Sequence, residues 1–576
     1  MPSALTYPGV YVEEIPSGVR PIAGVATSVT AFVGRAARGP ANEATTINSF
    51  GDFERIFGGL WLGNSLGYAV RDFFLNGGTQ AIVVRLVRPD QGDPQANPPV
   101  AGKPSKASLT VGALPLEARS DGSWGVALRA STDTDNISAD TAAALGVAKT
   151  DLFNLTVRDT SEGGASERFL NLTFKASSRQ VDKVLAAESQ LVAYKGTINE
   201  SLAVAKASDA LSQKETAYAA AKATLADKQN SGASDTDVQK AKADVDKAKG
   251  ELDQALTDAA AAVSDGGWLT VAEFLPAQGE ANKKGLFALE QADIFNLLCI
   301  PPYKGPAAAV DVDVNLVSAA AAYCEKRRAM LIVDTPKDWG SKTTAVTKFR
   351  DANTDYVGTR SRNAALFFPR LNQPDPLRDG QVGTFAACGA VAGVMARTDA
   401  QRGVWKAPAG LDATLTGVPQ LSVQLTDAEN GELNPLGVNC LRAIPPTGRV
   451  IWGSRTLRGA DGLADEYKYL PVRRTALYIE ESLYRGLKWV VFEPNDEPLW
   501  SQIRLNAGAF MHNLFRQGAF QGSTPREAYL VKCDKETTTQ NDINLGVVNV
   551  VIGFAPLKPA EFVIIKLQQL AGQIEV

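Results

Sequence analysis

The side chains that could carry chemistry are few and lie far apart in this chain of 576 residues. It has a single histidine, His512, so the commonest general acid–base chemistry has one candidate only. The five cysteines are Cys299, Cys324, Cys388, Cys440 and Cys533. No two of them form the CxxC pair of a zinc site, so we expect buried thiols in a reducing compartment and no bound metal.

A serine nucleophile is the least improbable enzyme hypothesis. Residues 63–67 (GNSLG) match the GxSxG pattern around Ser65. In that pattern the serine follows a buried strand and needs a base near it. Residues 58–62 (GGLWL) are too short for such a strand and begin with two glycines. The sequence therefore favours Ser65 as the N-cap of a helix over residues 66–75.

Two acidic motifs also have simple interpretations. Residues 311–315 (DVDVN) resemble the start of a calcium loop, but the later glycine and glutamate ligands are missing. Asp334 ends a predicted strand, where an α/β enzyme can place a catalytic acid. No partner base accompanies it, and a turn residue is expected. There is no P-loop, GxGxxG or HExxH motif. We therefore predict no enzyme, no cofactor and no catalytic, cofactor-binding or metal site.

The overall composition excludes further classes of protein. Lys and Arg total 59 and Asp and Glu total 63, a net charge of −4. The chain therefore lacks the basic excess of a protein that binds nucleic acid directly. The chain has no run of 18 or more apolar residues, so no membrane span is expected. The first residues (MPSALTYPGVYVEEI) have neither the basic nor the apolar part of a signal peptide. We expect a protein that is made and folded in a cytosol.

Helices between apolar strands predict an α/β core in two parts, residues 25–108 and 285–430. The first part has expected strands at 28–33 and 81–87, expected helices at 48–59 and 66–75, and a linker at 91–108. The second part has expected strands at 293–300, 329–333 and 364–368 and an expected helix at 318–328. An α+β unit follows over residues 431–560, with expected helices at 476–486 and 499–515 and expected strands at 489–492, 527–533 and 544–554.

Two insertions interrupt this core. Residues 109–180 predict a small, mainly β domain. Residues 181–264 are rich in Ala and Lys, and their apolar residues recur every seven positions: Val204, Leu211, Tyr218 and Leu225, then Val238, Val245, Leu252 and Ala259. Such spacing predicts an antiparallel helical hairpin, with arms of roughly 45–65 Å at ~1.5 Å per residue. The alternative is a pair of ordinary packed helices.

Each end of the chain carries an expected strand with no neighbouring partner in the sequence. Residues 10–15 (VYVEEI) lie within an N-terminal arm, residues 1–24, and residues 561–570 (EFVIIKLQQL) begin a C-terminal arm, residues 561–576. Each could be an ordinary strand of the chain's own sheet. Each could instead be donated to the sheet edge of a neighbouring copy, a contact that generates rings or helical filaments when repeated.

Several segments resemble the sheath proteins of contractile phage tails and bacterial contractile injection systems. They are YPGVYVEE (7–14), TSVTAFVG (27–34), AGVMARTD (392–399), RGVWKAPA (402–409), VIWGSRTL (450–457), KYLPVRR (468–474), FEPND (492–496) and PAEF (559–562). The resemblance covers roughly residues 5–90 and 285–570. The hairpin region departs from the family's shared core.

The resemblance implies a structural subunit with a sheath-type core. Copies form a homopolymer around an inner tube in a metastable extended state, and contraction follows a trigger from the baseplate. Partners are then further copies of the chain, the tube protein, and baseplate and terminal cap proteins, with no nucleic acid, cofactor or membrane span. The arms that join copies would include Val10, Tyr11, Val12, Glu13 and Glu14 at one end, and Glu561, Phe562, Val563, Ile564 and Ile565 at the other.

In this family the C-terminal domain lies closest to the tube. The expected helix at 499–515 and the residue after it carry Arg504, His512 and Arg516, which we take as candidate tube contacts. The alternative is that the helix only packs on its own sheet. Two other hypotheses stay open for the whole chain: a monomeric binding module that uses the hairpin, and an enzyme with an unrecognised site.

Overall fold

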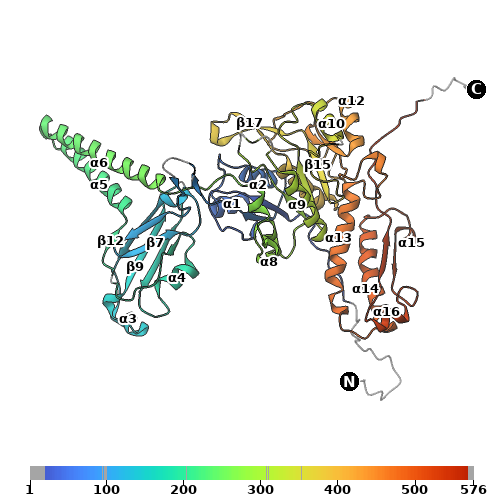
Figure 1. Ribbon diagram of the computed structural model, residues 1–576, viewed down its shortest axis with the longest axis horizontal. Helices are drawn as coiled ribbons and strands as arrows, with labels where there is room; N and C mark the ends of the chain where they lie inside the picture. The colour runs from blue at the N-terminus through green and yellow to red at the C-terminus, as the bar shows by residue number, and fades with distance from the viewer. Residues whose placement is uncertain are drawn as a thin grey trace, which may run out of the picture.

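The computed structural model describes residues 20–567, apart from residues 94, 96–99, 162, 203, 306–307, 309–310 and 352. The expected strand at residues 10–15 therefore lies outside the described residues, as do residues 568–570 of the expected C-terminal strand. Three parts lie in a row: a C-terminal unit, a central α/β body, and an outer β domain with a helical hairpin (Figure 1). The prediction of a mixed α/β and α+β chain is confirmed.

The central body is built on an eight-stranded sheet with the order β2-β3-β1-β13-β14-β15-β19-β20. Its strands are β1 (Thr30–Gly34), β2 (Thr45–Ile47), β3 (Ala81–Arg85), β13 (Leu297–Cys299), β14 (Met330–Asp334), β15 (Ala364–Phe368), β19 (Val438–Ile444) and β20 (Gly448–Ile451). Neighbours from β3 to β19 pair in parallel, and the edge strands β2 and β20 are antiparallel.

Helices cover both faces of this sheet, which explains why its parallel strands are continuous apolar runs. In β1, Ala31 and Val33 face one core while Phe32 faces the other. The helices on the Phe32 side are α1 (Phe50–Phe57), α2 (Leu66–Leu75) and α11 (Cys388–Arg402). The opposite side is covered by α7 (Val271–Phe274), α9 (Val314–Lys326), α10 (Lys342–Arg350) and α12 (Asp427–Leu433).

The central sheet extends past the expected boundary at residue 430. Both β19 and β20 belong to it, because β19 pairs with β15 in the middle of the chain's apolar core. Smaller elements of the body are α8 (Gly279–Asn282) and the sheet of β16 (Leu371–Pro374), β17 (Val382–Phe385) and β18 (Gln420–Leu421). The C-terminal unit therefore begins at α13 and not at residue 431.

The outer domain is larger than the expected span of residues 109–180. One of its sheets contains β6 (Ser108–Val111), β7 (Leu114–Ala118) and β11 (Val192–Tyr194). The other contains β8 (Leu128–Asp133), β9 (Phe153–Asp159), β10 (Ser166–Leu172) and β12 (Ala207–Ser208). Its helices are α3 (Ala139–Leu145) and α4 (Val181–Glu188), and the linker before it forms β4 (Gly92–Asp93) and β5 (Val100–Ala101). Because α4 buries Val181, Val184 and Leu185 in the domain core, this segment belongs to the β domain and not to the hairpin.

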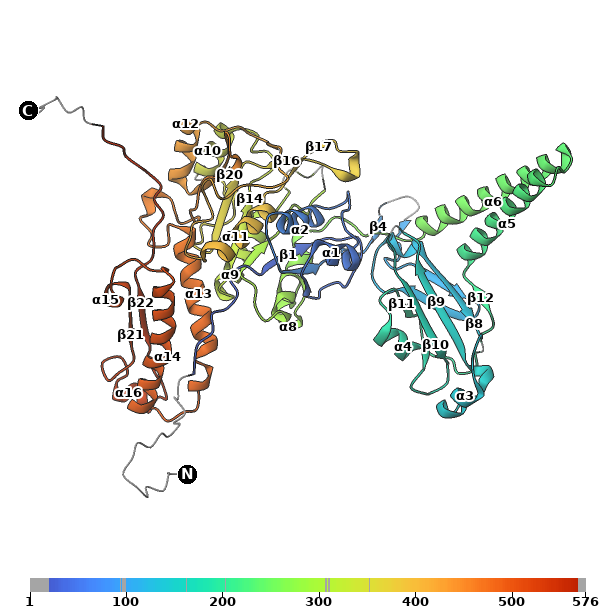
Figure 2. The same ribbon diagram turned by 180° about the vertical axis from the view of Figure 1, so that it is seen from behind.

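The hairpin consists of α5 (Ala210–Asn230) and α6 (Asp235–Ala261), and it projects away from the rest of the chain (Figure 2). Asp209 and Ser234 cap the two helices through side-chain hydrogen bonds. At ~1.5 Å per residue the longer arm spans about 40 Å, less than expected from the sequence. Val204 precedes the first helix and is buried in the β domain, so the heptad pattern begins one repeat later than predicted.

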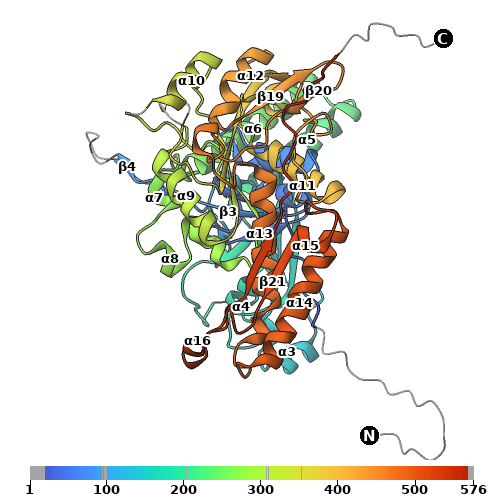
Figure 3. The same ribbon diagram turned by 90° about the vertical axis from the view of Figure 1, so that its right-hand side faces the viewer.

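The C-terminal unit packs two helices against a two-stranded sheet (Figure 3). It comprises α13 (Leu470–Gly486), α14 (Glu497–Arg516), α15 (Pro525–Ala528), β21 (Tyr529–Lys532), α16 (Gln540–Asn544) and β22 (Val551–Phe554). The expected strand at residues 489–492 is wrong. Phe492 has a φ of +72°, which strand backbone does not adopt, and its side chain is fully exposed.

None of the helices in the described ranges is long and apolar enough to cross a membrane. All five cysteines are buried free thiols, as expected.

Three arginines fasten the outer domain to the central body. The guanidinium of Arg85 is buried and donates to the backbone carbonyls of Ala36, Gly39 and Asp121 at 2.8–2.9 Å. Arg35 donates to two carbonyls of the returning segment, at residues 265 and 266. Arg38 forms an ion pair of 2.6 Å with a buried aspartate of β9. These contacts join the central body to the outer domain directly and to the segment that returns from it.

We predict that Arg85→Met weakens this connection. Three buried carbonyls lose a charged donor, so the free energy of unfolding should fall by about 2–4 kcal/mol. Proteolysis at residues 119–122 of the outer domain and in the connecting residues 264–267 should become faster. The control is Arg55→Met, because Arg55 forms an exposed pair with Asp52 that is worth little. Equal cleavage rates in the two variants would contradict the role of Arg85.

Candidate functional site

The residues that the sequence offered for chemistry have structural roles. Ser65 precedes α2 as its N-cap residue, as predicted, but its side chain makes no capping hydrogen bond. Asp311 forms a buried ion pair of 2.5 Å with Arg370. The Oδ1 atom of Asp334 accepts the backbone N–H groups of residues 387 and 388 at the start of α11. In the described part of the chain, no group of His, Cys, Asp or Glu side chains is arranged to hold a metal ion.

A dense polar network surrounds Arg455 instead. This guanidinium has no exposed surface. Its Nε and Nη2 atoms donate to the two carboxylate oxygens of Glu561 at 2.8 and 2.5 Å. Its Nη1 atom donates to Asp461 Oδ1 at 2.9 Å and to the carbonyls of Asn434 and Gly459. Two carboxylates therefore face one buried arginine, and one of them belongs to the last described residues of the chain.

The backbone of Arg455 is held as firmly as its side chain. Asn439 in β19 accepts its N–H at 2.7 Å and donates to its carbonyl at 2.8 Å. Tyr469 donates its hydroxyl to Glu561 at 3.2 Å. Burial lowers the pKa of Arg455, but the hydrogen bonds and charge of Glu561 outweigh that effect and the net shift is upward. The guanidinium therefore stays charged and fixed in direction.

This network was not predicted from the sequence, although its residues lie in segments that carry the family resemblance. Arg455 lies in VIWGSRTL, Tyr469 in KYLPVRR and Glu561 in PAEF. The available signal was an arginine four residues after the end of an apolar strand. Sequence spacing could not show the pairing, because Glu561 lies 106 residues beyond Arg455.

The segment after Glu561 leaves the surface of the protein. Residues 561–567 form no strand, contrary to the prediction, because no described segment lies beside them as a partner. Phe562, Val563, Ile564 and Ile565 are 76–82% exposed. Within the described ranges, no backbone hydrogen bond involves residues 557–567. A contiguous exposed apolar segment of this kind indicates an interaction site.

The sheet of β21 and β22 has edges at which another strand could add. Its two strands pair with each other, and no third strand of the described chain joins them. Leu530 and Val551 are each 47% exposed. A two-stranded sheet is only marginally stable by itself, so both edges are candidate acceptors for a further strand.

The beginning of the described chain is fixed to the same unit, at its far end. Residues 20–26 pack along α13 and α14. The backbone N–H of Arg20 donates to Asn506, and Ile22 is buried against Gly486. Further along, Arg474 forms a buried ion pair of 2.6 Å with Asp399. In Figures 1 and 3 the described chain enters at the end of the C-terminal unit that carries α16 and leaves toward the end where α12 lies.

All three candidate tube contacts belong to α14, but their settings differ. Arg504 pairs with Glu497 at 2.6 Å and also donates to the carbonyl of Cys533, so its charge is already engaged within the chain. His512 is exposed and lies 3.2 Å from the hydroxyl of Tyr529. Arg516 is exposed at the end of the helix. The structure does not gather the three into one cluster.

Comparisons with known proteins give one consistent result. The family model of the phage tail sheath protein central domain matches residues 279–457, and that of the phage tail sheath C-terminal domain matches residues 464–569. A tail sheath protein of Vibrio phage KVP40 is 29% identical over 127 residues. That alignment covers 22% of this chain and 18% of the relative, so the chain matches under a fifth of the relative's length.

Two solved structures share the fold over nearly the whole chain. The helical sheath of the anti-feeding prophage in its contracted state is 21% identical, with a TM-score of 0.51, covering 98% of this chain and 100% of the other. A sheath tail protein from Listeria innocua is 13% identical, with a TM-score of 0.52, covering 93% and 96%.

We predict that Glu561→Ala releases the end of the chain. The substitution leaves the buried Arg455 without its bidentate partner, which should cost about 3–5 kcal/mol. Amide hydrogen exchange at residues 455–457, whose N–H groups are hydrogen-bonded within the chain, should rise because the network around the buried guanidinium is disturbed. The control is Glu536→Ala, an exposed residue that pairs with exposed Lys532. The assignment fails if exchange at residues 455–457 is the same in both variants.

Proposed function

Because the chain belongs to the contractile tail sheath family, we propose that it polymerises around an inner tube in a metastable extended state. Contraction of the polymer drives the tube through a target envelope. Baseplate and terminal cap proteins bind the ends of the polymer. Assembly takes place in the bacterial cytoplasm, and the product is part of a virion tail or a phage-tail-like particle.

One observation supports the polymer proposal: Glu561 is fixed to the body, and the residues directly after it form an exposed apolar segment. Arg455 holds Glu561 in a buried network. The next residues, Phe562–Ile565 in sequence, are mainly apolar, extend away from the body and lack backbone partners in the described chain. A free monomer would gain nothing from this arrangement, whereas a polymer can bury these side chains between copies.

The sheet of β21 and β22 is the acceptor that fits such a segment. Residues 562–567 of one copy would add as a third strand to the sheet of the next copy. Main-chain hydrogen bonds would supply the affinity, and alternate side chains would settle on the exposed apolar positions Leu530 and Val551. The contact is head to tail, so repetition generates a ring or helix.

Strand donation also suits a contracting assembly. The donated segments act as tethers, while the bodies to which they are rooted rotate and slide between two packings. Residues 10–15 are proposed to serve as a second tether from the other end of the chain. No step requires a catalytic group, since the energy is stored during assembly.

We predict that the full chain forms hollow tubes, alone or with the inner tube protein. The double variant Phe562→Ser and Ile564→Ser should lose tube formation while keeping its thermal unfolding midpoint, because both side chains are exposed in the single copy. Lys566→Ser is the matched control, since it changes a charged residue of the same segment. Negative-stain electron microscopy checks the outcome. A small particle from the unsubstituted chain in both conditions would refute the sheath proposal.

The tube contact is proposed on the exposed face of α14. Leu505, His512 and Arg516 are exposed on this helix. They offer a small apolar contact together with charge, which suits a grip that must release during contraction. Arg504 is assigned a structural role instead, because its guanidinium is committed to Glu497 and Cys533.

Charge reversal separates these two roles. Arg516→Glu should reduce co-sedimentation with the inner tube protein and leave the fold unchanged. Arg504→Glu should instead lower the thermal unfolding midpoint, because it places two carboxylates side by side. Lys535→Glu is the control, as an exposed cation on the loop after β21. Undiminished co-sedimentation of Arg516→Glu would remove α14 from the tube contact.

A further inference from the structure

Exposed apolar side chains gather at the end of the C-terminal unit that carries α16. Two loops form this end: residues 487–496, between α13 and α14, and residues 545–550, after α16. The side-chain amide of Asn495 joins them by donating to the carbonyl of Val547 at 3.0 Å. We call this end the apolar tip, and its exposed apolar side chains are Val491, Phe492, Leu545 and Val547. Such a concentration of apolar surface indicates an interaction site.

Phe492 is the most unusual residue of the tip. Its φ of +72° lies in the left-handed region, which strains a residue that has a Cβ atom. The backbone is fixed on both sides, because Val491 donates its N–H to the carbonyl of Lys488 and Glu493 donates to that of Val490. The ring is fully exposed, so the single copy gains no burial in return for the strain. Strain of this kind is typical of functional positions, and here it places an aromatic ring in solvent.

The charge beside this ring is negative. Glu493 directly follows Phe492, is exposed, and forms no ion pair with any residue in the described ranges. Asp496, also exposed, accepts a backbone N–H at the start of α14. The surface that fits the tip is therefore an aromatic pocket with a cation at its rim.

The N-terminal arm of the same copy is a poor cover for the tip. Residues 1–19 precede Arg20, whose guanidinium lies 4.6 Å from the ring centre of Trp489, close to the tip. The only charged side chains of residues 1–19 are Glu13 and Glu14. Both would repel the carboxylate of Glu493, so the charge of the arm is wrong for this surface.

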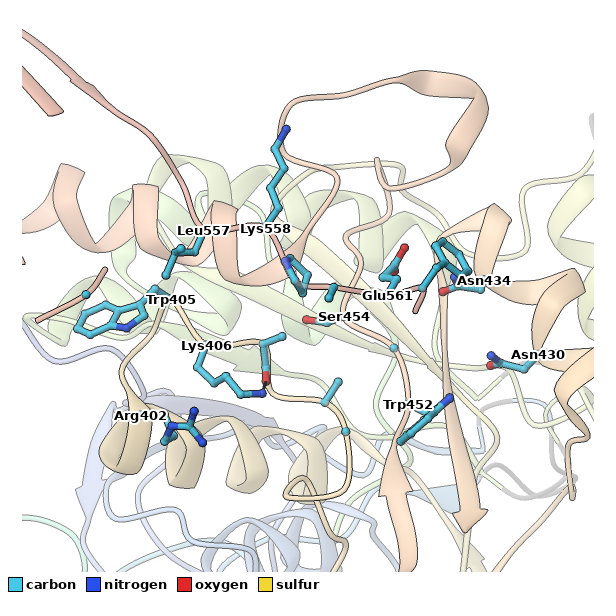
Figure 4. Close-up of a pocket in the computed structure, with 18 of the residues that line it drawn as sticks. Arg402, Trp405, Lys406, Asn430, Asn434, Trp452, Ser454, Leu557, Lys558 and Glu561 are labelled. Carbon is cyan, nitrogen blue, oxygen red and sulfur yellow. Dashed lines mark hydrogen bonds between the residues drawn. The ribbon is translucent and has the colours of Figure 1, made fainter. Parts of the chain in front are cut away.

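A groove with the fitting character lies at the other end of the same unit (Figure 4). Its walls are residues 405–410, residues 452–454 and residues 557–562, which enclose a cavity of about 720 Å³. A neighbouring cavity of about 620 Å³ shares Arg402 and Lys406 with it. The groove is large enough to receive an aromatic side chain together with the loop that carries it.

The side chains of the groove complement the tip. Trp405 and Trp452 provide aromatic surface. Ser454 is only 6% exposed, and its hydroxyl has no hydrogen-bond partner among the described residues. In Figure 4 its side chain lies between Lys406 and Glu561. Buried polar groups nearly always have a partner, and the carboxylate of Glu561 is already paired, so the hydroxyl indicates a ligand that brings its own acceptor.

The rim of the groove supplies the cation. Arg402 is partly offset by Asp412, whose carboxylate lies 3.8 Å away. Lys406 has no carboxylate partner in the part of the chain that the structure describes, and its Nζ donates to the carbonyl of Ala407 at 3.0 Å. Its charge is therefore available to an incoming carboxylate.

We propose that the apolar tip of one copy inserts Phe492 into this groove of the next copy. The ring packs against Trp405 and Trp452, and the carboxylate of Glu493 pairs with Lys406. In Figures 1 and 3 the α16 end and the end where the chain leaves are opposite ends of the C-terminal unit, so a copy does not fill its own groove. The contact is head to tail and repeats along a row of copies. It rests on the polymer proposed above and joins folded surfaces of the C-terminal units.

Cysteine cross-linking between full-length chains tests this contact. Val491→Cys is introduced in one preparation and Ala407→Cys in another that carries a different tag, so a mixed disulfide joins two copies. The native cysteines are all buried and should not react. We expect a heterodimer on oxidation of the mixture. The matched control pairs Ala407→Cys with Ser231→Cys, an exposed site at the turn of the hairpin, and should give no heterodimer.

The strained residue provides a sharper variant. Phe492→Gly in the Val491→Cys preparation should lower the heterodimer yield about tenfold, because the anchoring ring is gone. The thermal unfolding midpoint should stay the same or rise, since glycine adopts a φ of +72° without strain and the exposed ring supports nothing in the single copy. Val382→Ser is the matched control, because it removes another exposed apolar side chain, on β17, and should leave the yield unchanged.

The charge pairing gives an independent readout. Glu493→Lys in the tip should lower the heterodimer yield, because it faces Lys406 across the contact. Lys406→Glu in the other preparation should restore the yield. Recovery by the reciprocal change cannot arise from unfolding of either surface.

The outcomes separate this contact from the sheath proposal. Tubes without the heterodimer would overturn the contact and leave the sheath proposal intact. A heterodimer that depends on Phe492, from a chain that forms no tubes, would support the contact and refute the sheath proposal. If Phe492→Gly keeps the heterodimer yield but loses co-sedimentation with the inner tube protein, the tip belongs to the tube contact and the groove assignment is wrong. Absence of both tubes and heterodimer would overturn both proposals.

Discussion

The charge of a buried guanidinium must be compensated by nearby carboxylates, and this requirement determines how the chain is arranged around Arg455. Arg455 has no contact with solvent and depends on Glu561 and Asp461 for compensation. The pairing holds residues 557–561 against the body. It also sets the point at which the chain leaves the body, because the exposed apolar residues 562–565 begin directly after Glu561.

The rest of the fold supplies a rigid support for that pair. Asn439 ties the backbone of Arg455 to β19, inside a sheet whose strands are covered on both faces. Arg474 and Asp399 hold α13 to α11 through another buried ion pair. On the opposite side, Arg85 and its neighbours fix the outer domain to the same body. Buried arginines thus connect the parts where apolar contact alone would leave them free to move.

The sequence predicted the central architecture well because its signals are local. Short continuous apolar runs such as residues 329–333 and 364–368 are typical of strands covered on both faces, and they are β14 and β15. Boundaries that depend on distant partners were missed. Residues 181–188 look like the start of the hairpin, but burial of Val184 and Leu185 assigns them to the β domain. Likewise Arg455 and Glu561 give no local signal of their pairing, and the strand over residues 561–567 needs a partner that a single copy does not contain.

The two chain ends are rooted at opposite ends of the C-terminal unit, and this placement has a mechanical consequence. In the proposed polymer, a pull between neighbours would enter near Arg20, beside α14, and leave at Glu561. The load would then run lengthwise through α13 and α14 and into the Arg455 network, and it would bypass the outer domain. Tension in such a polymer would place no demand on the β domain or the hairpin. Their sequences would be free to diverge without weakening the connection between copies.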